Sequence, residues 1–422
     1  MKTYPLNNIV ATASVLSPFY KKLYQKLNID KQIDLSNLPL VNQDEFWRQN
    51  TINNNQLLTE EPSDGIVFKS GGTTGNPKFS VYSKMEWETM CGTFGQYLVN
   101  NGINDGDRVA NLFYAGELYS SFLFLHDSIE RCPANCMLFP ISGAASMEFI
   151  VHTLIDFKIN TLLAVPTTIM ALADYIHANN IEGLKVEKIY FGGETMYLDQ
   201  RKRLSDILKL TQIHSVGYAS VDAGLLGFAD STCGFNEHRV FDGYNILEII
   251  DEKTGKPIIE EGVEGKLYTT NLSRLIMPII RYPVGDNALW TSPPDTKHRK
   301  FRILGRSEEG ARIGPVSFYY EDLQKILLVF NEDLPISGYQ MIIDHINGKD
   351  KLTIKIGVEK IPDKIDIWSK RILDRIIDER PAFHEEEENG KVHPIAFEWV
   401  HSEELDTNPR TGKLMRIIDN RF

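Results

Sequence analysis

A short stretch rich in glycine and hydroxyl side chains is the first part of the chain whose residue types could do chemistry. It reads "FKSGGTTGNPKFS" from Phe68 to Ser80, at the end of the apolar run "GIVF". Glycines expose backbone N–H groups, and nearby hydroxyls and a lysine add donors and positive charge, which together suit phosphate oxygens. The spacing departs from the G-x-x-x-x-G-K-[ST] loop, because Asn76 follows Gly75 and Lys78 stands behind a proline. The stretch therefore predicts a phosphate site unlike that of P-loop NTPases, with a plain surface turn as the alternative.

Single charged or aromatic residues recur in short glycine-containing segments further along the chain. These segments are "YFGGETM" (190–196), "SVGYASVDAG" (215–224), "MPIIRYPVGDNALW" (277–290), "ILGRSEEGARIG" (303–314) and "NPRTGKLMRIID" (408–419). Each has a structural explanation when taken alone. An aspartate after glycine, such as Asp286, is usually a turn former or a helix cap, Tyr218 could belong to the core, and a lysine such as Lys413 is usually solvated. Their meaning depends on whether the fold brings them together.

The chain between about residue 65 and Tyr282 alternates apolar, strand-like runs with amphipathic helical patterns. Examples are "RVANLFY", "EFIVHTLIDFKI", "TLLAVP", "TIMALADYIHANN" and "EKIYFGGE". Such alternation with short connections predicts a mixed α/β domain built on largely parallel strands. Residues 246–272 change character, because their β-rich runs are separated by "EKTG" and "EGVEG" turns. They predict an antiparallel meander added to the α/β domain.

The last part of the chain has elements of its own. A hairpin is expected around "NGKD" at residues 347–350, followed by a helix over "DIWSKRILDRIIDER" and a strand over "IAFEWV". Roughly 110 residues with their own helix and strands suffice for a small domain. The sequence therefore predicts a large domain over residues 1–306 and a small domain over residues 307–422.

Composition limits the classes of partner. The 422 residues carry a formal net charge of −12, which argues against nucleic acid or an anionic membrane as the partner. The interrupted apolar patch at the N-terminus and the absence of any run of roughly 18 apolar residues predict no membrane span. Four cysteines in so long a chain do not make a disulfide framework. A cytoplasmic enzyme acting on a small molecule is the expectation.

The glycine-rich loop and the segments after it resemble, in order, the motifs of the adenylate-forming superfamily of acyl- and aryl-CoA synthetases. "SGGTTGNPK" is similar to that family's [ST]-G-T-T-G-x-P-K signature, and residues 277–286 resemble its P-x-x-R-Y-x-x-G-D motif. The run from residue 248 to 286 is particularly similar to the phenylacetate-CoA ligase branch, and phenazine-tailoring adenylating enzymes are one related group. The resemblance implies a large N-terminal domain of mixed sheets and helices with a small β meander, and a mobile α+β C-terminal domain.

The resemblance also implies roles in binding ATP. The loop residues that would hold the β- and γ-phosphates are Ser70, Gly72, Thr73, Thr74, Gly75 and Lys78. The other nucleotide contacts implied are Gly193 and Glu194 beside the adenine, Tyr218 stacked on the purine, Asp286 on the ribose hydroxyls, and Arg306 on the ribose and phosphate side.

Lys413 is the catalytic residue that the resemblance implies, since it matches the family lysine that bridges the attacking carboxylate and the α-phosphate. Asp222 stands where the family has a glutamate that helps to hold Mg²⁺, and its carboxylate still offers an oxygen ligand. Glu308 stands at the usual aspartate of the hinge between the domains. For contacts with an aryl or short acyl group the candidates are Tyr114, Tyr119 and Ala219, with core packing as the alternative for the tyrosines.

Three functional hypotheses follow. The first is an AMP-forming acid–thiol ligase that uses ATP and Mg²⁺ to convert a small, aromatic carboxylic acid to acyl-AMP and then to a CoA thioester. The second keeps the adenylation but passes the acyl group to a carrier protein, an enzyme or a reductase in secondary metabolism. The irregular segment after Glu308 favours it somewhat, so adenylation is better supported than transfer to CoA. The third is a non-catalytic nucleotide-binding protein, which Lys413 and Asp286 argue against. Homodimers are common in the resembled branch.

Overall fold

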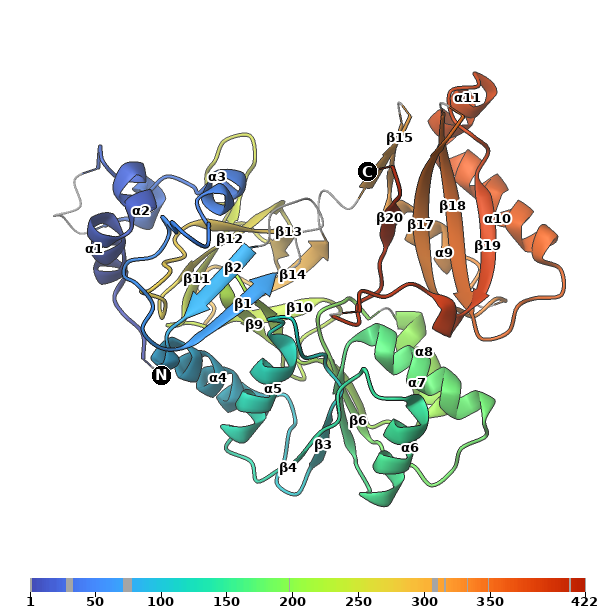
Figure 1. The fold of residues 1–422 in the computed structure, drawn as a ribbon, viewed down its shortest axis with the longest axis horizontal. Helices are drawn as coiled ribbons and strands as arrows, with labels where there is room; N and C mark the ends of the chain where they lie inside the picture. Colours follow the sequence, from blue (N-terminus) through green and yellow to red (C-terminus); the bar gives the residue numbers. More distant parts are fainter. Residues whose placement is uncertain are drawn as a thin grey trace.

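The computed structural model describes residues 2–27, 33–70, 78–196, 198–305, 310–314, 316–331, 333–347, 349–409 and 411–421, and describes only the backbone of Ser70, Asp199, Gly310, Arg312 and Ser317. A large N-terminal part and a smaller C-terminal part lie side by side (Figure 1). This confirms the predicted α/β class and its division into a large and a small domain. None of the described helices is long and apolar enough to cross a membrane.

A parallel sheet forms the first half of the large part. Of the described strands, those in it follow the order β4-β3-β5-β6-β7 and all pair in parallel. They are β3 (Arg108–Asn111), β4 (Met137–Pro140), β5 (Thr161–Ala164), β6 (Lys188–Phe191) and β7 (Gln212–Ser215). The helices beside them are α4 (Lys84–Leu98), α5 (Ser121–Glu130), α6 (Met147–Asp156), α7 (Pro166–Ala178) and α8 (Leu198–Ile207). Buried clusters that include Tyr190 on one side and Ile189 on the other show that both faces are covered, as parallel sheets require.

Between Tyr218 and Gly305 the described strands pair antiparallel, so the prediction of largely parallel strands up to Tyr282 is wrong for its last part. The reason is connection length: β8 (Tyr218–Ser220) and β9 (Gly224–Phe228) are joined by a turn too short for a crossover helix. The described strands of this sheet follow the order β11-β12-β13-β14-β10-β9-β8. The others are β10 (Glu237–Val240), β11 (Asn245–Ile250), β12 (Glu264–Asn271), β13 (Tyr282–Trp290) and β14 (Lys300–Gly305). The predicted meander at residues 246–272 is confirmed by the β11–β12 pairing.

The segment around Asp286 is not the tight turn that an aspartate after glycine suggested. Strand β13 continues through it, and residues 284–286 lie opposite a single residue of β12, Leu267, because the register shifts there. Gly285 has φ +97°, a conformation that suits glycine at a β-bulge. Because of the bulge, the direction of the Asp286 side chain departs from the regular alternation of side chains between the two faces of the strand.

Short helices and a hairpin complete the large part. The helices α1 (Leu6–Leu16), α2 (Pro18–Leu23) and α3 (Gln43–Arg48) pack their buried residues into one cluster with β11, β12 and β13. Strands β1 (Ile66–Ser70) and β2 (Lys78–Tyr82) pair antiparallel, with Ser70 opposite Lys78. The pairing brings both ends of the glycine-rich loop together. The loop residues 71–77 lie outside the described residues.

The small part is an α+β unit with its own core. Its described four-stranded sheet has the order β19-β18-β17-β20, and its core cluster is drawn from residues 311–395. The elements are β15 (Gly310–Ile313), β16 (Val316–Tyr319), α9 (Tyr320–Leu328), β17 (Ile336–Ile346), β18 (Lys349–Val358), α10 (Ile365–Glu379), α11 (Pro381–Glu388), β19 (Ala396–His401) and β20 (Ile417–Asp419). The hairpin predicted around "NGKD" is β17–β18. The domain boundary at 306/307 stays a proposal, since residues 306–309 lie outside the described residues.

An ion-pair network joins the small part to α7 and α8 of the large part, which lie beneath it in Figure 1. Arg203 of α8 pairs with Asp174 of α7 at 2.6 Å and also pairs with Glu359, which follows β18. His177 of α7 contacts the other oxygen of Glu359. The Ser337 hydroxyl of β17 donates to Asp174 at 3.2 Å. Because these partners come from both parts, the network favours the observed arrangement.

We expect Glu359→Gln to weaken the docking of the small part, by about two- to fivefold in the ratio of docked to undocked molecules, as for a screened ion pair. Burial alone would raise the pKa of Glu359, but hydrogen bonds from His177 and Arg203 outweigh it and hold that pKa below its ordinary value. The contribution of Glu359 to the stability of docking is therefore fully present above the ordinary glutamate pKa. It is lost as the pH falls through the lowered pKa.

Energy transfer between dyes at the exposed residues Phe157 and Ile367, titrated downward from pH 7, measures this docking. Glu386→Gln is the matched control, since Glu386 pairs with Lys391 inside the small part. A docked fraction in Glu359→Gln equal to that of the unaltered protein at every pH would contradict the prediction.

Candidate active site

The lysine near the C-terminus docks against the large part. Lys413 belongs to the segment before β20, and a Cβ placed on Gly193 would lie 2.8 Å from its Cε and 3.3 Å from its Nζ. Gly193 also has φ +81°. It follows β6 at the carboxyl end of the parallel strands, where open α/β sheets bind their ligands. The structure thus brings two predicted site residues together, and the missing side chain at Gly193 makes room for the lysine.

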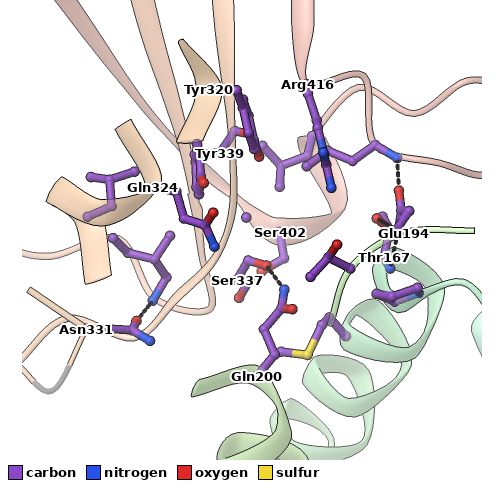
Figure 2. Close-up of a pocket in the computed structure, with 18 of the residues that line it drawn as sticks. Thr167, Glu194, Gln200, Tyr320, Gln324, Asn331, Ser337, Tyr339, Ser402 and Arg416 are labelled. Atoms are coloured by element: carbon purple, nitrogen blue, oxygen red, sulfur yellow. Dashed lines mark hydrogen bonds between the residues drawn. The ribbon is translucent and has the colours of Figure 1, made fainter. Parts of the chain in front are cut away.

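Glu194 is held between the two parts (Figure 2). Its Oε2 accepts hydrogen bonds from the backbone N–H of Thr167 at 3.0 Å and from the Thr167 hydroxyl at 2.8 Å. Its Oε1 accepts the backbone N–H of Leu414 at 2.6 Å. That Gly193 and Glu194 line an adenine pocket stays a prediction. The described contacts of the Glu194 carboxylate are with α7 and with the residue after Lys413. Sequence reasoning missed Thr167, whose one signal is its place after Pro166 at the start of α7.

The segment before β20 that carries Lys413, called the lysine segment below, also contacts Tyr114. A Cβ at Gly412 would come within 1.8 Å of the Tyr114 ring, and Gly412 has φ +67°, so both space and backbone conformation require glycine there. The Tyr114 hydroxyl lies 3.4 Å from that of Thr168 on α7. Tyr119 is half-buried, and Ala219 on β8 packs against the cluster that contains Phe94. The acyl-pocket assignment stays a prediction, and Tyr114 has the additional role of supporting the lysine segment.

Asp222 lies next to the strand that leaves the glycine-rich loop. The Ser80 hydroxyl of β2 donates to Asp222 Oδ1 at 3.4 Å, and the Tyr82 hydroxyl donates to the Val221 carbonyl at 2.8 Å. The fully buried Arg274 donates to the Asp222 carbonyl at 2.5 Å and to the carbonyl of Val81 at 2.6 Å. Arg274 therefore fixes this turn to the hairpin. Sequence reasoning missed it, since a lone arginine in "NLSRLIMP" gives no signal of a buried role.

Tyr218 and Asp286 meet although their strands are not neighbours in the sheet. The Tyr218 hydroxyl donates a hydrogen bond to Asp286 Oδ2. The Tyr218 ring packs near His238 and Phe301, with centroids 5.7 Å and 6.2 Å away. Burial lowers the pKa of His238 to about 4, so this neighbour is neutral near pH 7. Both residues stay predicted nucleotide contacts, and the hydrogen bond shows that Tyr218 also orients Asp286.

The remaining predicted residues divide into one that is described and several that are not. The ammonium of Lys78 lies over the ring of Trp47, 5.3 Å from its centroid. The predicted residues that lie outside the described part are Gly72, Thr73, Thr74, Gly75, Arg306 and Glu308, together with the side chain of Ser70. Their roles in phosphate binding, ribose binding and the hinge stay predictions.

A magnesium ion suits Asp222 on chemical grounds. Mg²⁺ prefers oxygen ligands and is commonly held by one or two carboxylates together with substrate phosphates, so one aspartate beside the strand that leaves the glycine-rich loop is a fitting donor. The group of described residues whose ligand atoms lie close enough to share an ion is elsewhere, at His126, Asp127 and Glu130 on α5. Magnesium at Asp222 stays a prediction.

A cavity of about 70 Å³ separates the two parts beside the lysine segment (Figure 2). Thr167, Glu194 and Gln200 line it from the large part. On the other side Tyr320 stacks on Tyr339, with centroids 4.6 Å apart. The two parts are thus in contact around this cavity without filling the space between them.

Several characterised proteins are similar to this chain in sequence. No family model matches the chain. It is 24% identical over 393 residues to the phenylacetate-coenzyme A ligase of Thermus thermophilus, covering 90% of this chain and 85% of that one. It is 23% identical over 300 residues to the phenylacetate-coenzyme A ligase of Escherichia coli, covering 70% and 66%. Over 258 residues, 60% of each chain, it is 28% identical to the indoleacetate–lysine synthetase of Pseudomonas savastanoi.

Solved structures share the whole fold. The 2-hydroxyisobutyryl-CoA ligase in its postadenylation state, in complex with 2-HIB-AMP, gives a TM-score of 0.77 at 16% identity, with 99% of this chain and 88% of that one covered. The same ligase in its thioesterification state gives 0.65, and in an open conformation 0.64. The two parts of this protein are therefore arranged more as in the postadenylation state.

The fold and the relatives define this protein as an enzyme, an AMP-forming ligase of the acyl- and aryl-CoA ligase type. The relatives and the solved structures support the adenylate-forming superfamily, in its phenylacetate-CoA ligase-like branch.

Proposed function

We propose that this enzyme activates a small, aromatic carboxylic acid with ATP and then transfers the acyl group to CoA. The observation that carries the proposal is the docking of Lys413, from the small part, onto Gly193 at the carboxyl end of the parallel sheet. A lysine delivered by a separate domain to a nucleotide-type site suits a reaction that needs its charge in one step and not in the next.

In the first step an oxygen of the carboxylate attacks the α-phosphorus of ATP, and the bond to pyrophosphate breaks. Both reactants are anionic, so the step needs positive charge and N–H donors aimed at the developing charge. Lys413 would lie between the carboxylate and the α-phosphate, and Lys78 with the glycine-rich loop would hold the leaving pyrophosphate. Mg²⁺ held by Asp222 would neutralise phosphate charge.

Nucleotide placement is the second requirement. Asp286 would accept hydrogen bonds from the ribose hydroxyls, and Tyr218, which donates to Asp286, would stack on the purine and fix that carboxylate. Gly193 and Glu194 would border the adenine, and Arg306 would contact the ribose and phosphate side. Correct placement matters because the reacting atoms must approach in line.

In the second step the CoA thiol, as its thiolate, attacks the acyl carbon, and AMP leaves. We propose that the small domain, residues 307–422, rotates about the hinge near Glu308 between the steps. That rotation would withdraw Lys413 and break the contacts of Glu359 with α7 and α8. Tyr114, Tyr119 and Ala219 would contact the acyl group, and two aromatic side chains there favour an aryl acid.

A non-CoA acceptor is the second candidate. It is favoured by the relative named indoleacetate–lysine synthetase and by a TM-score of 0.70, at 14% identity, to an acyl acid amido synthetase. In this alternative the adenylation is unchanged, and an amine, a carrier protein, another enzyme or a reductase attacks the acyl-AMP, as in phenazine-type secondary metabolism. The irregular segment after Glu308 also favours this second candidate somewhat.

Two assays test the proposal in sequence. Exchange of labelled pyrophosphate into ATP, run with a panel of aryl and short aliphatic acids plus Mg²⁺, identifies the acid. The best acid is then supplied with CoA, lysine or a carrier protein, and the acylated product is measured by mass spectrometry. Exchange that never exceeds the rate without acid would refute adenylation. Product with lysine or a carrier protein but not with CoA would favour the second candidate.

A further inference from the structure

We propose that Glu194 is a positioning residue for adenylation, which holds the segment of Lys413 against the large part through the backbone N–H of Leu414. The inference rests on the proposed function, because it assigns Glu194 to the step that uses Lys413. It is compatible with the proposal that Glu194 borders the adenine, because its backbone can face the nucleotide while its carboxylate, the group altered in the variants below, holds Leu414.

The Glu194 carboxylate is held by hydrogen bonds from within the large part, independently of the small part. Thr167 donates both its backbone N–H and its hydroxyl to Oε2, at 3.0 Å and 2.8 Å. These donors lie in the first turn of α7, where the helix dipole also favours a negative charge. Oε1 is thereby directed at the small part. A charge-assisted hydrogen bond to a preorganised acceptor is stronger and more directional than a neutral one.

The partner of Oε1 is the peptide that joins Lys413 to Leu414. Within the small part the Lys413 carbonyl accepts the backbone N–H of Asn408 at 2.8 Å, and the Gly412 N–H donates to the Asn408 carbonyl at 2.8 Å. The N–H of the same peptide donates to Glu194 at 2.6 Å. One rigid peptide therefore connects the turn that carries the lysine to the large part.

Two glycines complete the fit of this segment. Gly193 leaves space for the Lys413 side chain, and Gly412 lets the turn rest on Tyr114. Neither contact is directional, since both depend on the lack of a side chain. The bond from Leu414 to Glu194 is directional, and it fixes the backbone one residue away from the reacting ammonium. A small displacement there is costly for the rate, because the ammonium must meet two anions at once.

The bond exists only while the two parts are docked. A rotation that withdraws Lys413 must also separate Leu414 from Glu194, so the second half-reaction gains nothing from this carboxylate. Glu194 should therefore affect the turnover number of adenylation, with little effect on the affinity for ATP and none on the use of acyl-AMP.

The test compares both half-reactions in Glu194→Ala and Glu194→Gln. We expect Glu194→Ala to lower kcat for pyrophosphate exchange about 10- to 100-fold, to change KM for ATP by less than about twofold, and to leave consumption of supplied acyl-AMP unaltered. Glu194→Gln should recover part of the loss, because its single acceptor oxygen can serve Thr167 or Leu414 but not both. Glu182→Ala, on an exposed loop, is the matched control.

A double variant separates this inference from the proposed function. If Glu194 acts through the lysine, Lys413→Ala/Glu194→Ala exchanges pyrophosphate no more slowly than Lys413→Ala alone. Full exchange by Lys413→Ala would refute the proposed mechanism itself. With Lys413→Ala inactive, the inference is overturned by normal exchange in Glu194→Ala, by a rise confined to KM for ATP, or by equal losses in both half-reactions. Should Glu194→Ala not fold, Glu194→Gln and Thr167→Val provide the same comparison.

Discussion

Lys413→Ala is expected to lower pyrophosphate exchange by about 10²–10³-fold while sparing the reaction of supplied acyl-AMP with the acceptor. Removal of one preorganised charge at a developing transition state costs roughly 3–4 kcal/mol. In the structure the Lys413 side chain lies against Gly193. A rotation of the small domain would break this contact and move the lysine away. The second half-reaction expels no pyrophosphate and would proceed without that charge.

Two rates measured on the same Lys413→Ala protein decide this prediction: exchange of labelled pyrophosphate into ATP, and consumption of synthetic acyl-AMP. Lys391→Ala is a suitable control, because Lys391 is an exposed lysine of the same small part. Equal losses in both rates would contradict a rotation between the steps. Unaltered rates in both would show that Lys413 is a solvated surface charge.

Asp286→Ala is expected to lower kcat/KM for ATP by roughly one to two orders of magnitude. A hydrogen bond to a charged group contributes about 1.5–3 kcal/mol, and the ribose would lose such bonds. The β-bulge at residues 284–286 and the hydrogen bond from Tyr218 would hold the carboxylate in place for them. The measurement is the ATP dependence of pyrophosphate exchange at saturating acid.

Tyr218→Phe is the matched variant for Asp286. It keeps the ring that would stack on the purine and removes only the hydroxyl that donates to Asp286. We expect a smaller loss than in Asp286→Ala, because the carboxylate remains and only its orientation is released. Normal ATP kinetics in a folded Asp286→Ala protein would leave Asp286 as a structural residue of the bulge.

Much of the fold can be predicted from local sequence. Alternation of strand and helix patterns predicted the parallel α/β layer, since buried parallel strands and amphipathic helices have different periods. The "NGKD" turn predicted the β17–β18 hairpin. The order of the motifs predicted the family. The antiparallel strands after Tyr218 and the bulge at Asp286 were missed, because strand direction and register depend on partners far away in the chain.

For the site, the sequence by itself determined which residue types are present: hydroxyls and glycines for phosphate, Asp286 and Asp222 as carboxylates, and Lys413 as a cation. It could not determine which of them meet. Leu414 and Glu194 are 220 residues apart, and Ser80 and Asp222 are 142 apart, so no local pattern records either contact. Tertiary structure decided both: docking of the small part, which has its own core, brings Leu414 to Glu194, and packing within the large part brings Ser80 to Asp222. The position of Lys413 against Gly193 likewise depends on the docking of the two parts, and no local stretch of the sequence predicts it.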